Sequence, residues 1–191
     1  MWIKGKDNPR LFVAVPLPDE LKGSLAHQVE AVRKRYPFQT WVHPEDYHVT
    51  LKFLGETPRQ LLPRIEEALQ EVAQRHVPFS LILEGIGSFG QPKRPRILWL
   101  GVQGELARLA SLFRDVDEKM APLGFGKEER PFRPHLTLAR KYVGQTPFKI
   151  GLAGEETVAP LSFQVKEMIL YQSRLGEKPM YLPLIRFRLM G

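Results

Sequence analysis

The sequence of 191 residues predicts a mixed fold of strands and helices, arranged as two related lobes. Short runs rich in β-branched and aromatic residues alternate with stretches whose apolar residues recur every three or four positions. One tetrapeptide pattern occurs twice, 87 residues apart, within similar apolar surroundings. No low-complexity segment or long linker divides the chain, so we expect the two lobes to pack closely together.

The strands are predicted from their composition and from the Pro and Gly residues that bound them. They cover residues 10–16, 48–54, 79–83, 96–102, 135–139, 161–171 and 181–189. Residues 85–95 are rich in Gly, Pro and basic side chains and are predicted as a loop, as are residues 143–160.

Three helices are predicted from apolar residues that recur at helical spacing. The first covers about residues 18–36 and is ended by Pro37, and the second covers residues 59–75. The third helix is followed by Gly124, which is placed to cap it. The apolar stripes are Leu21, Leu25, Val29 and Val32, then Leu61, Ile65, Leu69 and Val72, then Leu109, Phe113, Val116 and Met120.

An internal repeat is the most informative feature of the sequence. A shift of 87 residues places residues 48–51 (His-Val-Thr-Leu) on residues 135–138 (His-Leu-Thr-Leu). The same ungapped shift also aligns the strand and the helix that precede each motif. Leu11, Val13 and Val15 fall on Leu98, Leu100 and Val102. We therefore expect two copies of one supersecondary unit, with divergent segments after the motifs.

The repeated His-x-Thr pattern predicts a catalytic pair. Side chains alternate between the two faces of a strand, so His48 and Thr50 share one face, as do His135 and Thr137. If the lobes are related by a pseudo-twofold axis, the two faces meet across a cleft. Two imidazoles then suit in-line displacement at phosphorus, one accepting a proton and the other donating one. The threonines can donate hydrogen bonds to phosphate oxygens. The residues themselves do not say which histidine is the acid.

Two cations near the motifs are candidates for contact with a phosphate. Arg140 is the closest guanidinium, but it lies five residues after His135, and this odd offset places it on the opposite face of a regular strand. It reaches the cleft only if the strand ends, bends or bulges near Ala139. Lys52 lies at an even offset from His48 and is predicted on the same face as that histidine, either as a phosphate contact or as a solvated side chain.

Composition excludes several other kinds of site and indicates the partner. With no Cys, the chain has no disulfide, Cys-based zinc site, iron–sulfur cluster or thiol nucleophile. No further His or carboxylate lies at ligand spacing around either motif, so no metal site is predicted. A net charge of +7 favours an anionic partner such as nucleic acid. The absence of Cys also predicts the cytoplasm as the compartment. The polar start and the absence of an apolar run near the roughly 20 residues of a membrane span predict no export signal and no membrane contact.

Other residues are open to a functional or a structural interpretation. The basic cluster at residues 93–96 is either a contact for a polynucleotide backbone or an exposed loop. Four aromatic residues are candidates for stacking on a base or for ordinary packing: Tyr47, Phe132, Tyr142 and Tyr181. The three other histidines, His27, His43 and His76, are predicted as surface or loop residues. Asp115 and Asp117 show no evident pairing with a histidine.

With both motifs in this framework, the chain resembles the two-histidine phosphoesterases, specifically the RNA 2′,3′-cyclic phosphodiesterases, once described as 2′-5′ RNA ligases. The resemblance runs nearly end to end. It includes residues 10–15, 48–55, 85–89, 97–101, 134–140 and 170–173, and Tyr181.

This resemblance implies a bilobal α+β fold over residues 1–191, with two antiparallel sheets around a central cleft, helices on the outside and an internal pseudo-twofold duplication. It implies hydrolysis of 2′,3′-cyclic phosphates at RNA ends to 2′-phosphates without a metal or cofactor. By motif position, His48 is the general acid for the 3′-oxygen and His135 is the base that activates water, while Thr50, Thr137 and Arg140 bind the phosphate.

Two alternative functions stay open at this point: an RNA ligase that runs the reverse reaction, and an RNA-binding module without catalysis. Because two lobes of one chain form the cleft, we expect a monomer with no obligate protein partner.

Overall fold

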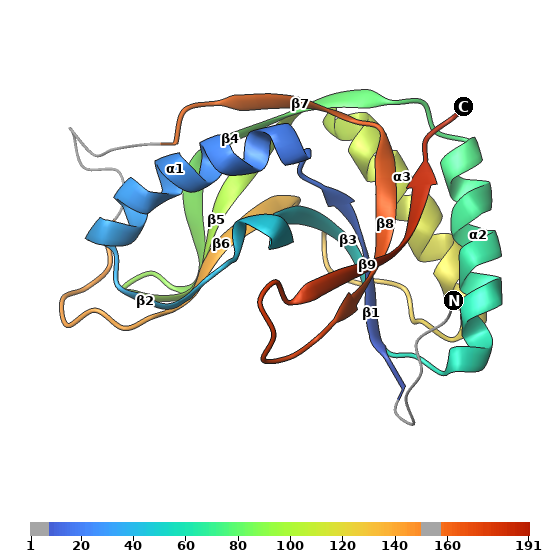
Figure 1. The fold of residues 1–191 in the computed structure, drawn as a ribbon, viewed down its shortest axis with the longest axis horizontal. Coiled ribbons are helices and arrows are strands. Elements are labelled where there is room, and N and C mark those ends of the chain that lie inside the picture. The colour runs from blue at the N-terminus through green and yellow to red at the C-terminus, as the bar shows by residue number, and fades with distance from the viewer. Residues whose placement is uncertain (1–7, 150–157) are drawn as a thin grey trace.

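A computed structural model of the chain describes residues 8–149 and 158–191. The polar start and much of the predicted loop at 143–160 lie outside the described residues. The described part is an antiparallel sheet, curled on itself, with three helices packed against it (Figure 1). Its strands and α-helices are β1 (Arg10–Pro16), α1 (Asp19–Arg35), β2 (Phe38–Trp41), β3 (His48–Glu56), α2 (Leu62–Gln74), β4 (Phe79–Gln91), β5 (Arg94–Gly104), α3 (Leu106–Met120), β6 (His135–Tyr142), β7 (Leu161–Val165), β8 (Glu167–Ser173) and β9 (Tyr181–Arg188).

The strand order of the sheet confirms the α+β class and shows the internal duplication. The order is β7-β4-β5-β6-β3-β1-β8-β9, and β2 pairs with β6. The two motif strands, β3 and β6, are central neighbours. Strand β1 flanks β3 and is joined to it through α1, as β5 flanks β6 and is joined to it through α3. The two halves are therefore related by a pseudo-twofold axis between β3 and β6.

The two sheets expected from the sequence are continuous with each other. One residue pair joins them, Val49 of β3 with Leu136 of β6. Each motif strand pairs much more extensively with its own partner, β3 with β1 and β6 with β5. The halves are thus distinct in their pairing, but a central contact links them into a single sheet.

Both halves contain the same β-bulge, immediately after the His-x-Thr motif. In the first half Ala14 pairs with Thr50 and Val13 with Lys52, which leaves Leu51 as the extra residue. A bulge of this kind changes which face the following side chains occupy. In the second half Trp99 pairs with Thr137 and Leu98 with Ala139, so that Leu138 is the extra residue.

Strand pairing also refines the repeat. Thr50 and Thr137 are 87 residues apart, but their partners Ala14 and Trp99 are 85 apart. The ungapped alignment of the first strand is therefore two residues out of structural register. A shift of two leaves every side chain on the same face of a strand, which is why the apolar pattern matches in either alignment.

The prediction of a loop at residues 85–95 is wrong, because β4 and β5 form one long hairpin through most of this segment. Gly85 and Gly90 have positive φ angles of 74° and 105° and lie at irregularities in the pairing, so the strands continue beyond each of them. Gly87 pairs with Trp99, and a Cβ atom there would lie 2.2 Å from Trp99 Cη2. The glycines of this segment shape a strand and leave room for an indole.

Two further differences concern strands. The predicted strand at 161–171 is two strands separated by Lys166, because β7 pairs with β4 whereas β8 pairs with β1. The chain thus passes from one half of the sheet to the other at this residue, along the top of Figure 1. Strand β2 was not predicted, since its four residues are too few to show a pattern.

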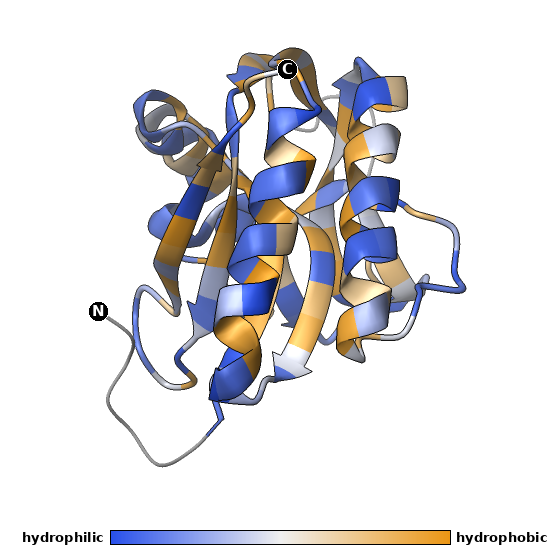
Figure 2. Ribbon diagram, turned by 90° about the vertical axis from the view of Figure 1, so that its right-hand side faces the viewer, coloured by the Kyte–Doolittle hydropathy of each residue, from blue (hydrophilic) through white to orange (hydrophobic). Residues whose placement is uncertain are grey.

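The three predicted helices are confirmed, and their apolar faces pack on one side of the sheet in a single core. Helices α2 and α3 contact each other, and their hydrophilic residues point outward (Figure 2). Helix α3 passes directly into a 3-10 turn at Ala121–Leu123, and Gly124, with a φ of 95°, caps this turn rather than α3 itself. No helix in the described residues is long and apolar enough to cross a membrane.

The bulge at Leu51 turns Lys52 into this core, contrary to the prediction that it shares a face with His48. Its Nζ lies 2.5 Å from Asp117 Oδ1 on α3 and 2.7 Å from the carbonyl oxygen of Gly126. Lys52 and Asp117 are both only 7% exposed. The buried ion pair therefore joins β3 to α3.

Replacing Lys52 by Met should lower the free energy of unfolding by about 3–5 kcal/mol, because Asp117 would be left as an unpaired buried charge. Denaturant unfolding measures the loss. As a control, Arg33→Met removes an exposed pair with Glu30 and should change stability by less than about 1 kcal/mol. Equal losses in the two variants would contradict the structural role given to Lys52.

Candidate active site

The motif residues lie on the face of the sheet opposite the helices. Strand β1 sends Leu11, Val13 and Val15 into the main core, whereas Phe12 and Ala14 belong to a small separate cluster on the other face. Because Ala14 pairs with Thr50 and Pro16 with His48, this second face also carries the motif side chains. The same holds for His135 and Thr137, which pair with Gly101 and Trp99.

The central contact brings the two motifs into one site. Val49 and Leu136 are antiparallel neighbours, so His48 lies across from Thr137 and Thr50 lies across from His135. Diagonal neighbours across an antiparallel pair, as His48 and His135 are, lie about 7–8 Å apart, with their Cβ atoms somewhat closer, so both imidazoles can contact one small group. The structure therefore places all four motif side chains around the pseudo-twofold axis.

Each imidazole is oriented by a backbone carbonyl two residues before it. His48 Nδ1 lies 2.6 Å from the carbonyl oxygen of Asp46, and His135 Nδ1 lies 2.7 Å from that of Arg133. A carbonyl oxygen only accepts hydrogen bonds, so each Nδ1 carries the proton and donates it. Nε2 is thus the nitrogen left to exchange protons in both residues. For His48 it lies 3.1 Å from Thr50 Oγ1, whose hydroxyl donates to it in the neutral form.

Burial keeps both histidines neutral in the free protein. Desolvation lowers the pKa of His48 to about 4, against an opposing effect of the Asp46 carbonyl and carboxylate. The positive charge of Arg140 lowers it further, as does that of His135 whenever His135 is protonated. The pKa of His135 is also lowered, again mainly by burial, then by Arg140. The two imidazoles and the guanidinium therefore share one electrostatic environment.

Arg140 reaches this face because of the bulge at Leu138. Without the extra residue its odd offset from His135 would point it into the core, a position that Ala139 occupies instead. Arg140 pairs with Ile97, two residues from Trp99 on the same face of β5. Its guanidinium also lowers the pKa of the Tyr181 hydroxyl by its charge and a hydrogen bond, although burial raises that pKa overall.

The contact between Arg140 and Tyr181 shows that the sheet is strongly curled. The strand order puts β6 and β9 four strands apart, a separation of about 19 Å in a flat sheet. Their side chains interact nonetheless, so the sheet bends around the site and brings its far edge toward the motif strands.

Aromatic side chains that the sequence did not single out surround both histidines. The ring of His48 lies 5.0 Å from Phe12 and 6.1 Å from Tyr171. The ring of His135 lies 4.9 Å from Phe89 and 6.3 Å from Trp99. In the sequence, only Phe12 indicated such a residue. It is a large aromatic side chain that alternates with the core-facing residues of β1 and therefore lies on the opposite face.

Phe53 is a further aromatic on this face and is 71% exposed. It pairs with Phe12, and the two ring centroids are 5.9 Å apart. By the 87-residue repeat it occupies the position of Arg140 in the other half. The two equivalent positions thus carry a cation on one side of the site and an exposed aromatic ring on the other.

Of the four aromatic candidates for stacking, only Tyr181 lies at the site, with its ring 5.1 Å from that of His48. Tyr47 is buried in the main core. Phe132 stacks on Phe113 at 4.2 Å, and Tyr142 packs against Phe38. The other three are therefore packing residues.

Asp46 connects β9 to the site. Its carboxylate is buried and accepts hydrogen bonds from the backbone N–H groups of Met180 (2.8 Å) and Tyr181 (3.0 Å). Its own carbonyl orients His48. One residue thereby fixes the imidazole and the start of the strand that carries Tyr181.

The remaining histidines lie away from this site. His27 is exposed on α1, and His43 accepts a hydrogen bond from the backbone N–H of Glu45. His76 lies in the loop between α2 and β4, one of its two predicted settings, but its side chain is largely buried, with Nε2 2.7 Å from Asp115 Oδ2. The expectation that Asp115 has no histidine partner is therefore wrong.

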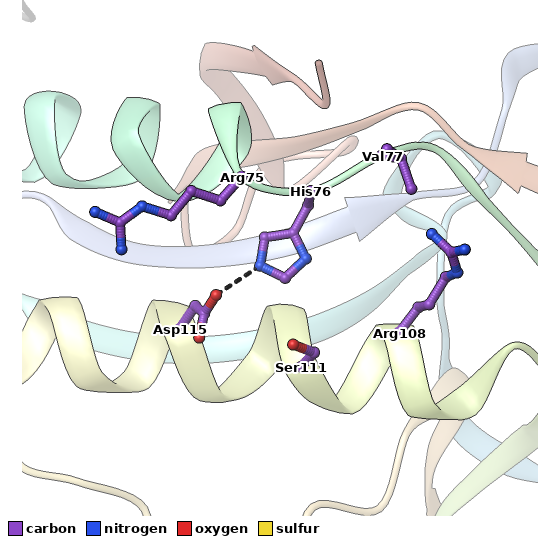
Figure 3. A pocket seen from close by; sticks show the side chains of 6 residues that line it. All are labelled: Arg75, His76, Val77, Arg108, Ser111 and Asp115. Carbon is purple, nitrogen blue, oxygen red and sulfur yellow. Dashed lines mark hydrogen bonds and ion pairs between the residues drawn. The ribbon is translucent and has the colours of Figure 1, made fainter. Parts of the chain in front are cut away.

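The His76–Asp115 pair borders a small pocket between α3 and the segment that follows α2 (Figure 3). Arg75, Val77, Arg108 and Ser111 also line it. This pocket lies on the helix side of the molecule, remote from the paired motifs. Within residues 8–149 and 158–191, no group of three His, Asp or Glu side chains is arranged to hold a metal ion.

Comparisons with known proteins agree with the duplication. The sequence model of a family described as LigT like Phosphoesterase matches residues 15–99 and again residues 100–181. The boundary between the two matches falls within β5, the strand that flanks β6 in the second half of the duplication.

Named relatives and a solved structure are similar over most of this chain. An RNA 2′,3′-cyclic phosphodiesterase of Geobacillus stearothermophilus is 42% identical over 94% of this chain, which spans 57% of that relative's length. One from Bacillus subtilis is 33% identical, over 95% of this chain and 97% of the relative. The crystal structure of E. coli LigT with 3′-AMP superposes with a TM-score of 0.74 at 27% identity, covering 97% of this chain and all of that one.

Imidazole titration followed by NMR should give a pKa near 4 for His48 and one below 6.5 for His135, against about 6.5 for both in the urea-unfolded chain. Arg140→Gln should raise both values, because losing a positive charge favours the protonated imidazole. Lys141→Gln, one residue further along, serves as the matched control. Unchanged histidine pKa values in the Arg140 variant would refute the placement of its guanidinium.

Proposed function

Because the chain belongs to the LigT-like phosphoesterase family, we propose that it hydrolyses 2′,3′-cyclic phosphates at RNA ends to 2′-phosphomonoesters. The observation that carries the proposal is the placement of two His-x-Thr motifs around one axis, with each Nε2 free to exchange a proton. Two relatives that match this chain well are named RNA 2′,3′-cyclic phosphodiesterases. LigT of E. coli, solved with 3′-AMP, supports a site that accepts a nucleotide with its phosphate.

In the proposed reaction, His135 Nε2 accepts a proton from water as its oxygen attacks phosphorus. The bond from phosphorus to the 3′-oxygen breaks on the opposite side, and His48 Nε2–H donates a proton to that leaving oxygen. The product has a 2′-phosphate and a 3′-hydroxyl. Proton exchange with solvent then restores the starting forms of both imidazoles. The assignment of acid and base to the two histidines follows the family resemblance.

The substrate itself would supply the condition that His48 needs. In the free site its pKa of about 4 leaves it neutral, whereas a general acid must carry a proton. The negative charge of a bound cyclic phosphate favours the imidazolium and raises this pKa. The Asp46 carbonyl and carboxylate act in the same direction. His135, neutral in the free site, is ready to accept a proton.

Three other side chains complete the proposed site. Arg140 would form charge-assisted hydrogen bonds with the non-bridging phosphate oxygens. Thr50 and Thr137 would donate hydrogen bonds to the same oxygens as charge develops on them. The exposed ring of Phe53 offers a surface on which the terminal base can stack. No step of this scheme requires a metal or a cofactor.

We also propose that residues 1–191 act as one two-lobed phosphoesterase domain and as a monomer, because the two halves of a single chain supply both motifs. An RNA end as substrate favours the cytoplasm as the compartment.

His48→Ala and His135→Ala should each lower kcat by about 10²–10⁴, the usual scale of acid–base catalysis. The assay is hydrolysis of nucleoside 2′,3′-cyclic phosphates in the presence of EDTA, with the product isomer identified by phosphorus NMR. His27→Ala, on the exposed surface of α1, is the matched control and should keep full activity. Undiminished turnover in either motif variant would overturn the proposed mechanism, as would a 3′-phosphate product.

The profile of kcat/KM against pH should be bell-shaped with its maximum between about pH 4 and 6.5. The productive form carries one proton on the two histidines, and the pKa of each lies below 6.5 in the free protein. The profile of kcat should lie at higher pH, because the bound anion raises both pKa values. A kcat/KM maximum above about pH 7.5 would contradict the neutral state assigned to the free site.

A further inference from the structure

We propose that the tip of the β4–β5 hairpin binds the phosphate backbone of the RNA strand whose end occupies the active site. This proposal depends on the function proposed above and identifies where the rest of the substrate lies. Three exposed side chains, Lys93, Arg94 and Arg96, form the contact and are called the basic tip below.

The basic tip is a direct extension of the active site. On β5, Trp99 lies beside His135 and Ile97 pairs with Arg140. Arg96 is the next residue along the strand, and Arg94 is three residues beyond Ile97, about 10 Å at the rise of a β-strand. This length corresponds to about three nucleotides of a stacked strand at 3.4 Å each. A strand bound at Arg140 can therefore continue along the hairpin.

The hairpin holds these cations in a defined place. Its strands stay paired to the end, with Gln91 opposite Arg94. The backbone N–H of Phe148 donates to the carbonyl oxygen of Lys93 at 2.9 Å, so the loop after β6 supports the turn. Phe148 is itself buried among Tyr36, Phe38 and Tyr142. The tip is thus anchored to the core rather than free in solution.

The cations of the basic tip have no ionic partners among the described residues, unlike many basic residues elsewhere on the surface. Arg108 pairs with Glu105, for example, and Arg174 pairs with Glu177. Pairing with a carboxylate satisfies a surface cation within the protein. The guanidinium and ammonium groups of the basic tip are instead available to an external anion.

The surroundings of the basic tip are free of acidic residues in the described part of the chain that forms this end of the sheet. Pairing of β2 with β6 and of β6 with β5 brings together the three segments 31–44, 135–149 and 85–104, of which β2 and the tip of the β4–β5 hairpin lie at the lower left of Figure 1. These three segments contain nine Lys and Arg and no Asp or Glu. The rest of the chain contains 19 Lys and Arg against 21 Asp and Glu, so the excess positive charge of the protein belongs to this end.

A nucleic-acid backbone is the partner that this arrangement fits. Three cations within four residues of a turn and its strand can contact neighbouring phosphates, and contacts of this kind position a nucleic-acid strand without reading its sequence. Phosphate contacts release counterions, so their contribution falls as salt rises. A nucleoside cyclic phosphate carries only the phosphate that reacts, so it has no further phosphate for the basic tip to contact.

The test compares a long and a short substrate in the variant Lys93→Gln/Arg94→Gln/Arg96→Gln. For a single-stranded ten-nucleotide RNA with a 2′,3′-cyclic phosphate end, we expect KM to rise about 10- to 100-fold at low salt with kcat unchanged. The slope of log KM against log salt concentration should fall by about 2, as expected for three lost contacts to a single strand. Turnover of a nucleoside 2′,3′-cyclic phosphate should not change.

The matched control is Arg64→Gln/Lys166→Gln/Arg188→Gln, which removes three exposed cations that lie outside the three acid-free segments. It should leave all these values unchanged. An unchanged KM for the long RNA in the basic-tip variant would overturn the proposal. Equal losses on the long and short substrates would also overturn it, because the tip would then act on the active site itself.

Direct binding separates this proposal from the catalytic one. Fluorescence anisotropy measures the Kd of a labelled ten-nucleotide RNA that ends in a 3′-phosphate and needs no turnover. If the wild-type protein hydrolyses neither substrate, the proposed function fails. Even in that case, a larger Kd in the basic-tip variant alone would support the RNA contact. Equal Kd values in the wild type and both variants would refute it.

Discussion

One extra residue after each motif, Leu51 in β3 and Leu138 in β6, determines what both faces of the central sheet contain. In a regular strand Arg140 would enter the core and Lys52 would face the histidines. The bulges exchange these positions, so that Arg140 joins the imidazoles and Lys52 forms a buried pair with Asp117. A local irregularity in pairing thus serves the chemistry on one face and joins β3 to α3 on the other.

The duplicated scaffold carries an asymmetric site, and this asymmetry gives its two histidines different properties. Both imidazoles are held by a carbonyl two residues upstream, so the same nitrogen, Nε2, is left to exchange protons in each. Around His48 lie Phe12, Tyr171 and Tyr181, whereas His135 packs against Phe89 and Trp99. The deeper burial of His48 lowers its pKa to about 4. His48 and His135 occupy equivalent positions in the two halves but differ in proton affinity, as acid and base roles require.

The errors of the sequence-based prediction have a common cause. Helices and the first strand were predicted within a few residues, because their apolar periodicity is local. The Gly and Pro content of residues 85–95 predicts a loop. In the structure, Gly85 and Gly90 have positive φ angles at irregularities in strand pairing, and Gly87 leaves room for Trp99. Lys166 separates two strands only because their partners belong to different halves of the sheet. In each case the partner strand, which a local pattern does not reveal, decides the conformation.

The sequence by itself determined the duplication, the four motif side chains and the face that they share, since alternation along a strand depends only on neighbouring residues. It also placed a basic cluster at residues 93–96 without distinguishing a contact from a loop. Tertiary structure decided that Arg140 faces the histidines, that Phe12, Phe53 and Trp99 line the site, and that the cluster ends a rigid hairpin continuous with it. These outcomes depend on the register between strands distant in sequence, which long-range packing selects and composition does not record.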